Sequence, residues 1–139
     1  MKNTKSSIAA ANASALIVDD DSFILEYFSE LLSVMGIADI HTAGDGSVGL
    51  RTLIELPQPP DFLICDVFMP DMDGFEFLGE LATKNYQGGI ILVSGLDITL
   101  MAMAQQIALD NGLRVWGAYS KPVSFATLST TLNNFGINH

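Results

Sequence analysis

Five polar side chains in this sequence are of the types that together could handle a phosphate group. They are Asp19, Asp20, Asp66, Ser94 and Lys121. Carboxylates that lie close together repel, by about 4 kcal/mol for two charges 4 Å apart at an effective dielectric near 20. A hard divalent cation relieves that repulsion, and Mg²⁺ accepts one or two carboxylates while keeping waters that a phosphate can replace.

In such a site, Asp66 would attack a phosphoryl group as the nucleophile. Lys121 would hold either Asp66 or a phosphoryl oxygen, and the Ser94 hydroxyl would donate a hydrogen bond to the same group. Each residue alone also has an ordinary explanation. An aspartate after a strand often caps the next helix, a serine there is common turn chemistry, and a Lys-Pro pair is often only a loop. The functional interpretation therefore depends on the fold bringing all five together.

The chain alternates short apolar runs with longer segments of helical periodicity. The apolar runs cover residues 15–18, 38–43, 62–65, 89–93 and 113–118, and their lengths predict five strands. Residues 21–36, 46–56, 75–84, 97–111 and 125–135 have helical spacing. Asp21 is a good N-cap and Gly36 a good residue to end the first helix.

This alternation predicts an α/β fold. Parallel strands joined by helices with right-handed crossovers form a doubly wound sheet, and the flavodoxin-like (βα)₅ arrangement with strand order 2-1-3-4-5 is the natural solution. Ligands in such folds bind beyond the carboxyl ends of the strands, at the switch point between strands 1 and 3. The first strand runs into Asp19 and Asp20, the third into Asp66 and the fourth into Ser94, so we expect these residues to converge there.

The composition fits one globular domain. The chain has 139 residues, 49% of them apolar, and a net charge of −10 that disfavours direct binding of nucleic acid. No run of about 18 apolar residues predicts a membrane span. The single cysteine, Cys65, lies in an apolar run and is interpreted as a small buried hydrophobe in a cytoplasmic protein. We expect residues 1–13 to be a mobile leader and residues 14–136 to be the domain.

Four segments together resemble the receiver domain of bacterial two-component response regulators, the chemotaxis-regulator-like family. They are LIVDDD at 16–21, ICDVFMPDMDG at 64–74, VSG at 93–95 and KP at 121–122. The second segment is highly specific, and the others follow in the family's order.

The resemblance implies a phosphoryl acceptor at Asp66, served by a sensor histidine kinase or a phosphotransfer protein. It implies that Asp19, Asp20, Asp66 and the backbone carbonyl of Phe68 surround Mg²⁺. Ser94 and Lys121 would contact the phosphoryl group, and the bond between Lys121 and Pro122 would be cis. The domain would not be an enzyme beyond its own phosphorylation and dephosphorylation.

The sequence departs from the family's pattern at the position three before Lys121. Many receivers have an aromatic residue there, but this chain has Ala118, with Tyr119 beside it. The segment from Ser94 to Lys121 is also a few residues longer than in a minimal receiver. Its pattern resembles receivers fused to cyclic-di-GMP phosphodiesterase (EAL) domains.

Two bulky residues predict a slow loss of the phosphoryl group. Phe68 and Leu96 each lie two residues beyond a site residue, at positions that in this family border the path of the attacking water. Apolar side chains there would exclude that water.

Two other functions compete with a phosphorylated receiver. A haloacid-dehalogenase-like phosphatase also uses an aspartyl nucleophile, but its Asp-x-Asp-x-Thr pattern does not match Asp19-Asp20-Asp21 or Asp66-Val67-Phe68. A pseudo-receiver would only bind partners. The segment 97–111 is more apolar than a one-sided surface helix requires, which indicates either deep burial or a partner face. An output domain or a second copy would then bind through the fourth helix, fifth strand and fifth helix.

Overall fold

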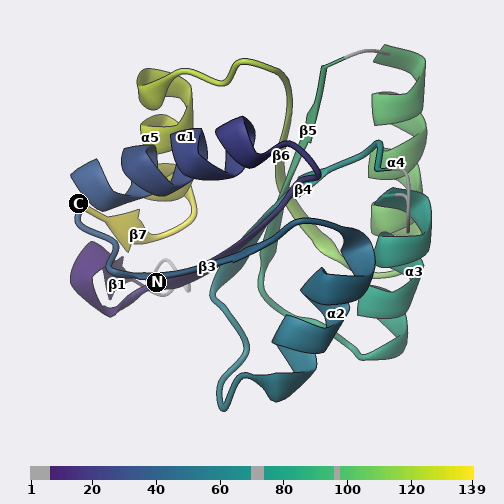
Figure 1. The fold of residues 1–139 in the computed structure, drawn as a ribbon, viewed down its shortest axis with the longest axis horizontal. Coiled ribbons are helices and arrows are strands. Elements are labelled where there is room, and N and C mark those ends of the chain that lie inside the picture. The colour runs from purple at the N-terminus through teal and green to yellow at the C-terminus, as the bar shows by residue number, and fades with distance from the viewer. Residues whose placement is uncertain (1–6, 70–73, 96–97) are drawn as a thin grey trace, which may run out of the picture.

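The computed structural model describes residues 7–69, 74–95 and 98–139, and it contains a five-stranded parallel sheet with helices on both faces (Figure 1). The strands are β2 (Ser14–Val18), β3 (Asp39–Ala43), β4 (Phe62–Asp66), β5 (Gly89–Ser94) and β6 (Arg114–Ser120). Their order is β3-β2-β4-β5-β6. Counted from the first strand of this sheet, that order is 2-1-3-4-5, so the predicted topology is confirmed.

Five helices connect and follow these strands. They are α1 (Ser22–Val34), α2 (Gly46–Glu55), α3 (Gly74–Thr83), α4 (Ile98–Asp110) and α5 (Phe125–Asn134). Helices α1 and α5 cover one face of the sheet, and α2, α3 and α4 cover the other (Figure 1). The Asp21 side chain accepts the backbone N–H of Phe23, and Gly36 ends the first helix region at a φ of +95°, as the sequence predicted. Among the described helices, none has the length and apolar character needed to cross a membrane.

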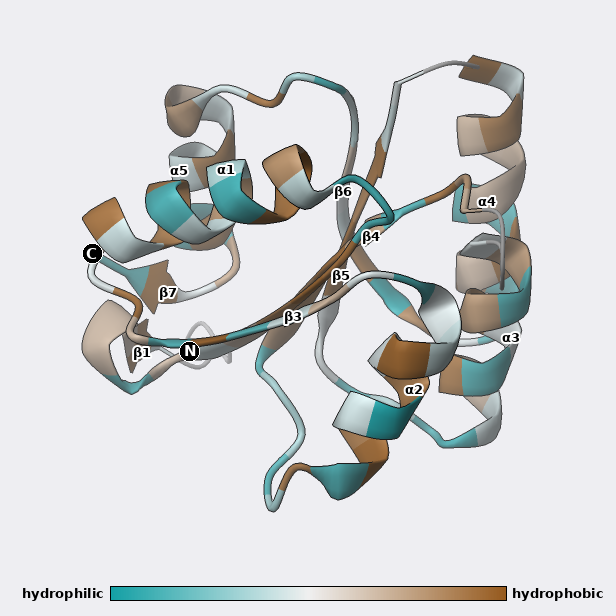
Figure 2. Cartoon of the chain, viewed as in Figure 1, coloured by the Kyte–Doolittle hydropathy of each residue, from teal (hydrophilic) through white to brown (hydrophobic). Residues whose placement is uncertain are grey.

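The central strands β4 and β5 are buried along their whole length, and β2 is buried from Ala15 onward. Their apolar residues alternate between two clusters, one under each helical layer, and form the brown centre of Figure 2. A fully buried Leu, Ile or Phe contributes about 1.5–3 kcal/mol relative to exposure. Because both faces of these strands are buried, their sequences are continuous apolar runs. The same packing fixes the positions of their carboxyl ends relative to one another.

The described part of the expected mobile leader, residues 7–13, is not a free segment. Ile8–Ala9 forms a strand, β1, which pairs in parallel with β7, Ile137–Asn138, near the C-terminal end of the chain (Figure 1). A short 3₁₀ turn, η1 (Ala10–Asn12), follows, and Ala13 is fully buried. This segment is therefore packed against the domain, because Ile8, Ala10 and Ala13 join the apolar cluster beneath α1 and α5.

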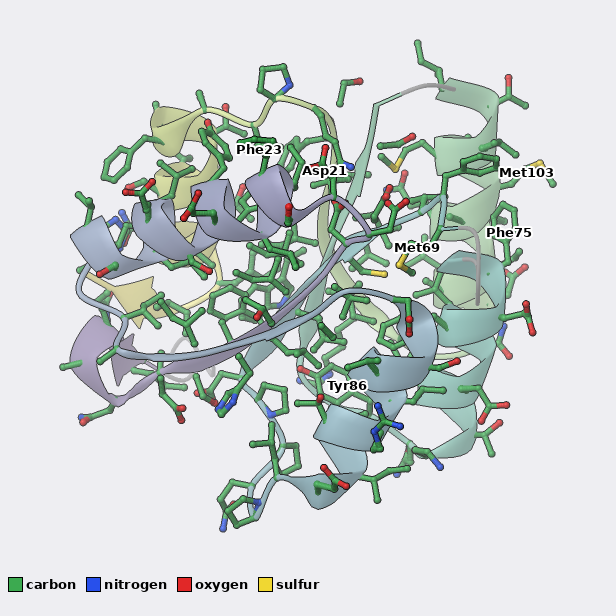
Figure 3. The ribbon with its side chains drawn as sticks, in the orientation of Figure 1. Asp21, Phe23, Met69, Phe75, Tyr86 and Met103 are labelled. Atoms are coloured by element: carbon green, nitrogen blue, oxygen red, sulfur yellow. The ribbon has the colours of Figure 1, made fainter. Side chains whose placement is uncertain are left out.

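Helix α4 is not deeply buried, which excludes one of the two interpretations of its apolar sequence. Ala104 and Ala108 are its buried residues, and they face the sheet. Ile98 is 82% exposed and Leu109 53% exposed. Met103 is 49% exposed and projects from the outer side of the helix (Figure 3). The apolar residues of α4 thus form a surface.

Candidate functional site

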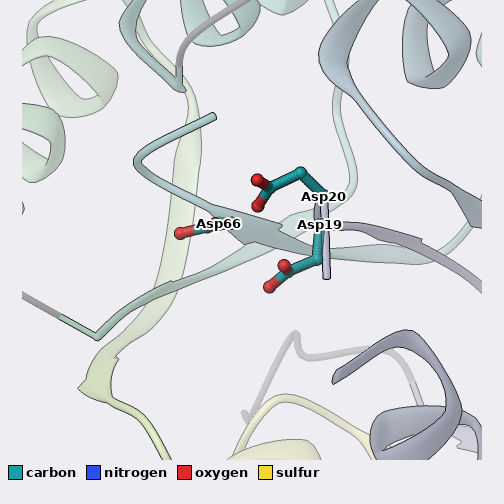
Figure 4. Close-up of side chains that lie close together, drawn as sticks. All are labelled: Asp19, Asp20 and Asp66. Carbon is teal, nitrogen blue, oxygen red and sulfur yellow. The ribbon is translucent and has the colours of Figure 1, made fainter. Parts of the chain in front are cut away.

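Three aspartates meet at the carboxyl ends of two neighbouring strands. Asp19 and Asp20 follow β2, and Asp66 is the last residue of β4, which pairs with β2 in parallel. One carboxylate oxygen from each residue lies within 4.8 Å of the others (Figure 4). Asp19 and Asp66 are buried and Asp20 is exposed, so the cluster opens to solvent on the side of Asp20.

Local hydrogen bonds hold the two buried carboxylates. Asp19 Oδ1 accepts the backbone N–H of Asp21 at 2.9 Å, and Asp66 Oδ1 accepts the backbone N–H of Phe68 at 3.2 Å. Asp21 therefore does more than cap α1, since its own N–H fixes Asp19. The sequence pattern did not predict this contribution, although the adjacency of the aspartates was a signal for it.

Glycine at position 74 allows the start of α3 to approach the backbone of Val67 closely. The Gly74 N–H donates to the Val67 carbonyl at 2.9 Å. A Cβ on Gly74 would lie 2.4 Å from that same oxygen, a contact that backbone atoms cannot relieve cheaply. This close approach gives a physical reason for the glycine of the motif. The preceding residues of the motif, 70–73, lie outside the described residues.

Lys121 joins the cluster from the segment after β6. Its Nζ lies 2.7 Å from Asp19 Oδ2 and 3.4 Å from Asp66 Oδ2. The sequence predicted a contact with Asp66, but the shorter contact is with Asp19. The backbone N–H of Lys121 donates to the Ser94 carbonyl at 2.9 Å, and the peptide bond between Lys121 and Pro122 is cis, as expected.

Ser94 ends β5, beside the strand that carries Asp66. It is 5% exposed and lies opposite Ser120 of β6. All five polar residues singled out in the sequence thus lie at the carboxyl edge of the sheet. The position of the Phe68 carbonyl relative to a cation stays a prediction.

Burial dominates the electrostatics of the cluster. It raises the pKa of Asp66 to about 6, helped by the nearby charge of Asp19 and opposed by the Phe68 N–H and by Lys121. Burial also raises the pKa of Asp19, against the contact with Lys121. Burial alone would lower the pKa of Lys121, but its two carboxylate partners outweigh that effect and raise it. One ammonium thus faces three carboxylates, and the cluster carries excess negative charge.

The donor set suits a hard divalent cation. Carboxylate oxygens are the ligands that Mg²⁺ prefers, and here three converge from a rigid sheet edge. Asp19 Oδ2 is a buried oxygen without a hydrogen bond, its contact with Lys121 being an ion pair. A cation at the cluster would satisfy that oxygen and neutralise the excess charge.

Comparison with known proteins matches residues 15–133 to the family model of the response regulator receiver domain. The chain belongs to this family. It is a receiver domain of a two-component system, and the phosphoacceptor role of that family fits its acidic cluster. Receiver domains bind Mg²⁺ at such a cluster, and they interact with histidine kinases and phosphotransfer proteins.

Two curated relatives and one solved structure illustrate the similarity. A probable chemotaxis protein CheY of Rhizobium etli is 35% identical over 107 residues, which cover 75% of this chain and 81% of that protein. A probable C4-dicarboxylate response regulator, DctR of Bacillus subtilis, is 32% identical over 98 residues, which cover 68% of this chain. The crystal structure of CheY4 of Vibrio cholerae has a TM-score of 0.74 at 28% identity and covers 88% of this receiver and 98% of that chain.

The receiver accounts for only part of several longer relatives. The match spans 42% of the DctR regulator, for example. Receiver domains are generally not catalytic enzymes, although some relatives that carry one are protein-glutamate methylesterases.

Proposed function

We propose that Asp66 accepts a phosphoryl group from a sensor histidine kinase or a phosphotransfer protein. The observation that carries this proposal is the convergence of three carboxylate oxygens within 4.8 Å, with Lys121 Nζ 2.7 Å from Asp19 and 3.4 Å from Asp66. Asp66 is chosen as the acceptor because it ends the central strand β4, next to the strand that ends at Ser94, and lies 3.4 Å from Lys121 Nζ.

Asp19, Asp20, Asp66 and the Phe68 carbonyl are the proposed ligands of Mg²⁺. When bound, the cation would offset the negative charge of a transferring phosphoryl group. Lys121 supplies a second positive charge and forms ion pairs with Asp19 and Asp66. Its ammonium group can move from these carboxylates to a phosphoryl oxygen within the same cluster. The Ser94 hydroxyl is the proposed hydrogen-bond donor to another phosphoryl oxygen.

We propose that the signal leaves the domain through α4, β6 and α5. These three elements contain two charged residues, Asp110 at the end of α4 and Arg114 at the start of β6, whereas the whole chain contains 22. Depletion of charge is typical of the centre of protein interfaces. An output domain or a second copy fits this surface, and the acidic remainder of the chain disfavours nucleic acid.

Two finer assignments rest on sequence patterns alone. The longer segment between Ser94 and Lys121 supports membership of the receivers fused to cyclic-di-GMP phosphodiesterase domains. The family also supports a cytoplasmic protein without catalytic activity on other substrates. The pseudo-receiver alternative is not favoured, because the acidic cluster and its lysine are complete.

Incubation with acetyl phosphate tests the proposal without the kinase. Transfer of one phosphoryl group adds about 80 Da to the intact mass. We expect this gain in wild type with Mg²⁺, none with EDTA, and no sustained release of phosphate from p-nitrophenyl phosphate. Absence of the gain in folded wild-type protein with Mg²⁺ would favour the pseudo-receiver, and multiple turnover of the ester would favour a phosphatase.

A further inference from the structure

A cavity of about 200 Å³ lies between the start of α4 and the end of β6, next to Ser94. Its walls include Ser94, Ile98, Met101, Ala118, Tyr119 and Ser120. The walls therefore combine apolar groups with hydroxyl groups. The cavity lies within the charge-depleted surface of α4, β6 and α5, and it shares Ser94 with the phosphoacceptor cluster.

The small side chain at position 118 leaves this space open. Ala118 faces the helical layer of α2 to α4, where it packs beside Leu92, its partner in register on β5. Its neighbour Tyr119 belongs to the opposite apolar cluster, and its hydroxyl hydrogen-bonds to Thr131 of α5. Since successive side chains of a strand alternate between faces, the Tyr119 ring cannot fill the cavity without breaking that packing.

The mouth of the cavity lies beside an exposed apolar surface. Ile98, at its edge, is 82% exposed. Met103, farther along α4, is 49% exposed and projects outward (Figure 3). A hollow beside exposed apolar side chains is a common setting of the residues that dominate a protein interface.

We infer that this cavity receives the side chain of a tyrosine from a protein partner that binds α4 and β6. The inference rests on the proposed function, because it specifies how the partner reads the phosphorylated domain. An apolar cavity of about 150 Å³ accommodates benzene, so about 200 Å³ suffices for a phenol ring and its methylene. The Met101 thioether suits an aromatic ring, and the hydroxyls of Ser94 and Ser120 suit the phenol oxygen.

A second copy of this chain does not supply such a tyrosine. The chain has three, and each is engaged in its own fold. Tyr27 donates to the Val123 carbonyl at 2.6 Å and Tyr86 to the Pro60 carbonyl at 2.7 Å, while Tyr119 bonds to Thr131. The partner is therefore a different protein.

Ser94 links this cavity to phosphorylation. Ser94 lines the cavity, and its hydroxyl is also the proposed donor to the phosphoryl group. Movement of Ser94 toward the phosphoryl group widens the cavity, so phosphorylation tightens binding of the aromatic side chain. Reciprocal coupling of this kind commonly changes affinity fivefold or more.

The test uses p-cresol, which has the side-chain structure of tyrosine, and the full chain labelled with ¹³C in its methionine methyls. Titration is expected to shift the Met101 signal but not that of Met35, which is buried in the opposite cluster. Ala118→Phe fills the cavity and weakens binding at least about tenfold, or about 1.4 kcal/mol. Ala118→Val is the milder variant and gives an intermediate loss. Ala126→Phe, the same change at an exposed site on α5, leaves binding unaltered.

The outcomes separate this inference from the proposed function. Binding of p-cresol is measured first without phosphorylation, so this result does not depend on whether Asp66 accepts a phosphoryl group. No selective shift at Met101, or equal binding by folded Ala118→Phe protein, overturns the cavity as an aromatic site. Dissociation of a homodimer by p-cresol overturns the hetero-partner and assigns the cavity to a second copy. In acetyl phosphate and Mg²⁺, wild type is expected to bind p-cresol more tightly than Asp66→Asn does. Equal affinity of the two proteins overturns the link through Ser94.

Discussion

Asp66 couples the protonation of the site to the stability of the fold. Its pKa is raised from 3.8 to about 6, mainly by burial, so the folded chain binds this proton more tightly than the unfolded chain does. The stabilisation is fully present below pH 3.8 and is lost as the pH rises through about 6.

Without Mg²⁺, we therefore expect wild type to lose stability relative to Asp66→Asn as the pH rises from 4 to 7. A rise of about two pKa units corresponds to at most about 3 kcal/mol. Urea unfolding of both proteins at several pH values measures this difference, and Mg²⁺ is expected to reduce it. A difference that does not change with pH would contradict the raised pKa.

Phe68 controls how long the phosphoryl group survives in this account. Phe68 lies two residues beyond Asp66, the last residue of β4, and its side chain is 55% exposed. Its companion in this prediction, Leu96, lies outside the described residues. We expect Phe68→Ala to accelerate dephosphorylation about tenfold, since water reaches the phosphoryl group more readily.

Phe23→Ala is the matched control, because Phe23 is 79% exposed at the start of α1 (Figure 3). The rate is followed by intact mass after removal of acetyl phosphate. Unassisted dephosphorylation of wild type within seconds, or equal rates for wild type and Phe68→Ala, would refute the role of Phe68.

Gly89, the first residue of β5, leaves room for the stacked ring of Trp116. Trp116 stacks with both Phe62 and Phe135, with ring centroids at 5.8 and 5.1 Å. A Cβ on Gly89 would lie 2.0 Å from the Trp116 ring, so the ring or the strand would have to shift and disturb the stacking.

Gly89→Ala is therefore expected to destabilise the fold by about 1–3 kcal/mol. Gly79→Ala, on the exposed side of α3, meets no atom within 4 Å and should stabilise the helix by up to about 1 kcal/mol. Thermal unfolding of both variants measures the contrast. Equal melting temperatures would show that the aromatic stack yields to the added methyl group.

The sequence predicted the helices and strands well where a long run of residues is buried, and poorly where an element has only two residues. The apolar run at 62–65 and the caps at Asp21 and Gly36 gave boundaries close to those observed. Strands β1 and β7 have two residues each, too few for a periodic pattern, and only their mutual pairing creates them. In the site, the order of motifs brought the right residues together, but the preference of Lys121 for Asp19 depends on side-chain geometry that spacing does not encode.

At the scale of the whole molecule, strands β1 and β7, far apart in the sequence, pair with each other beneath the layer of α1 and α5. Ile137 is 1% exposed and pairs in register with Ile8. We expect Ile137→Ala to cost about 2–4 kcal/mol, whereas Val34→Ala, at a position 75% exposed, changes stability little. Chemical denaturation measures both. A loss for Ile137→Ala no larger than that for Val34→Ala would show that the paired strands do not contribute to the core.

Charged residues are distributed unevenly over the surface of the molecule. The acidic cluster lies at the carboxyl edge of the sheet, while α4, β6 and α5 carry two charged residues between them. Phosphorylation adds further negative charge at that edge, about −1.5 to −2 when phosphoserine is taken as the guide. The charge-poor surface beside it is suited to report that change, because Ser94 adjoins both regions.

The central claim is that Asp66, rather than Asp19 or Asp20, receives the phosphoryl group. Borohydride reduces an aspartyl phosphate to homoserine, so reduction after treatment with acetyl phosphate and Mg²⁺, followed by peptide mass mapping, locates the modified residue directly. The account predicts homoserine at position 66 in wild type and at none of the three positions in Asp66→Asn. Homoserine at position 19 or 20 of the wild type, or undiminished modification of Asp66→Asn, would contradict it.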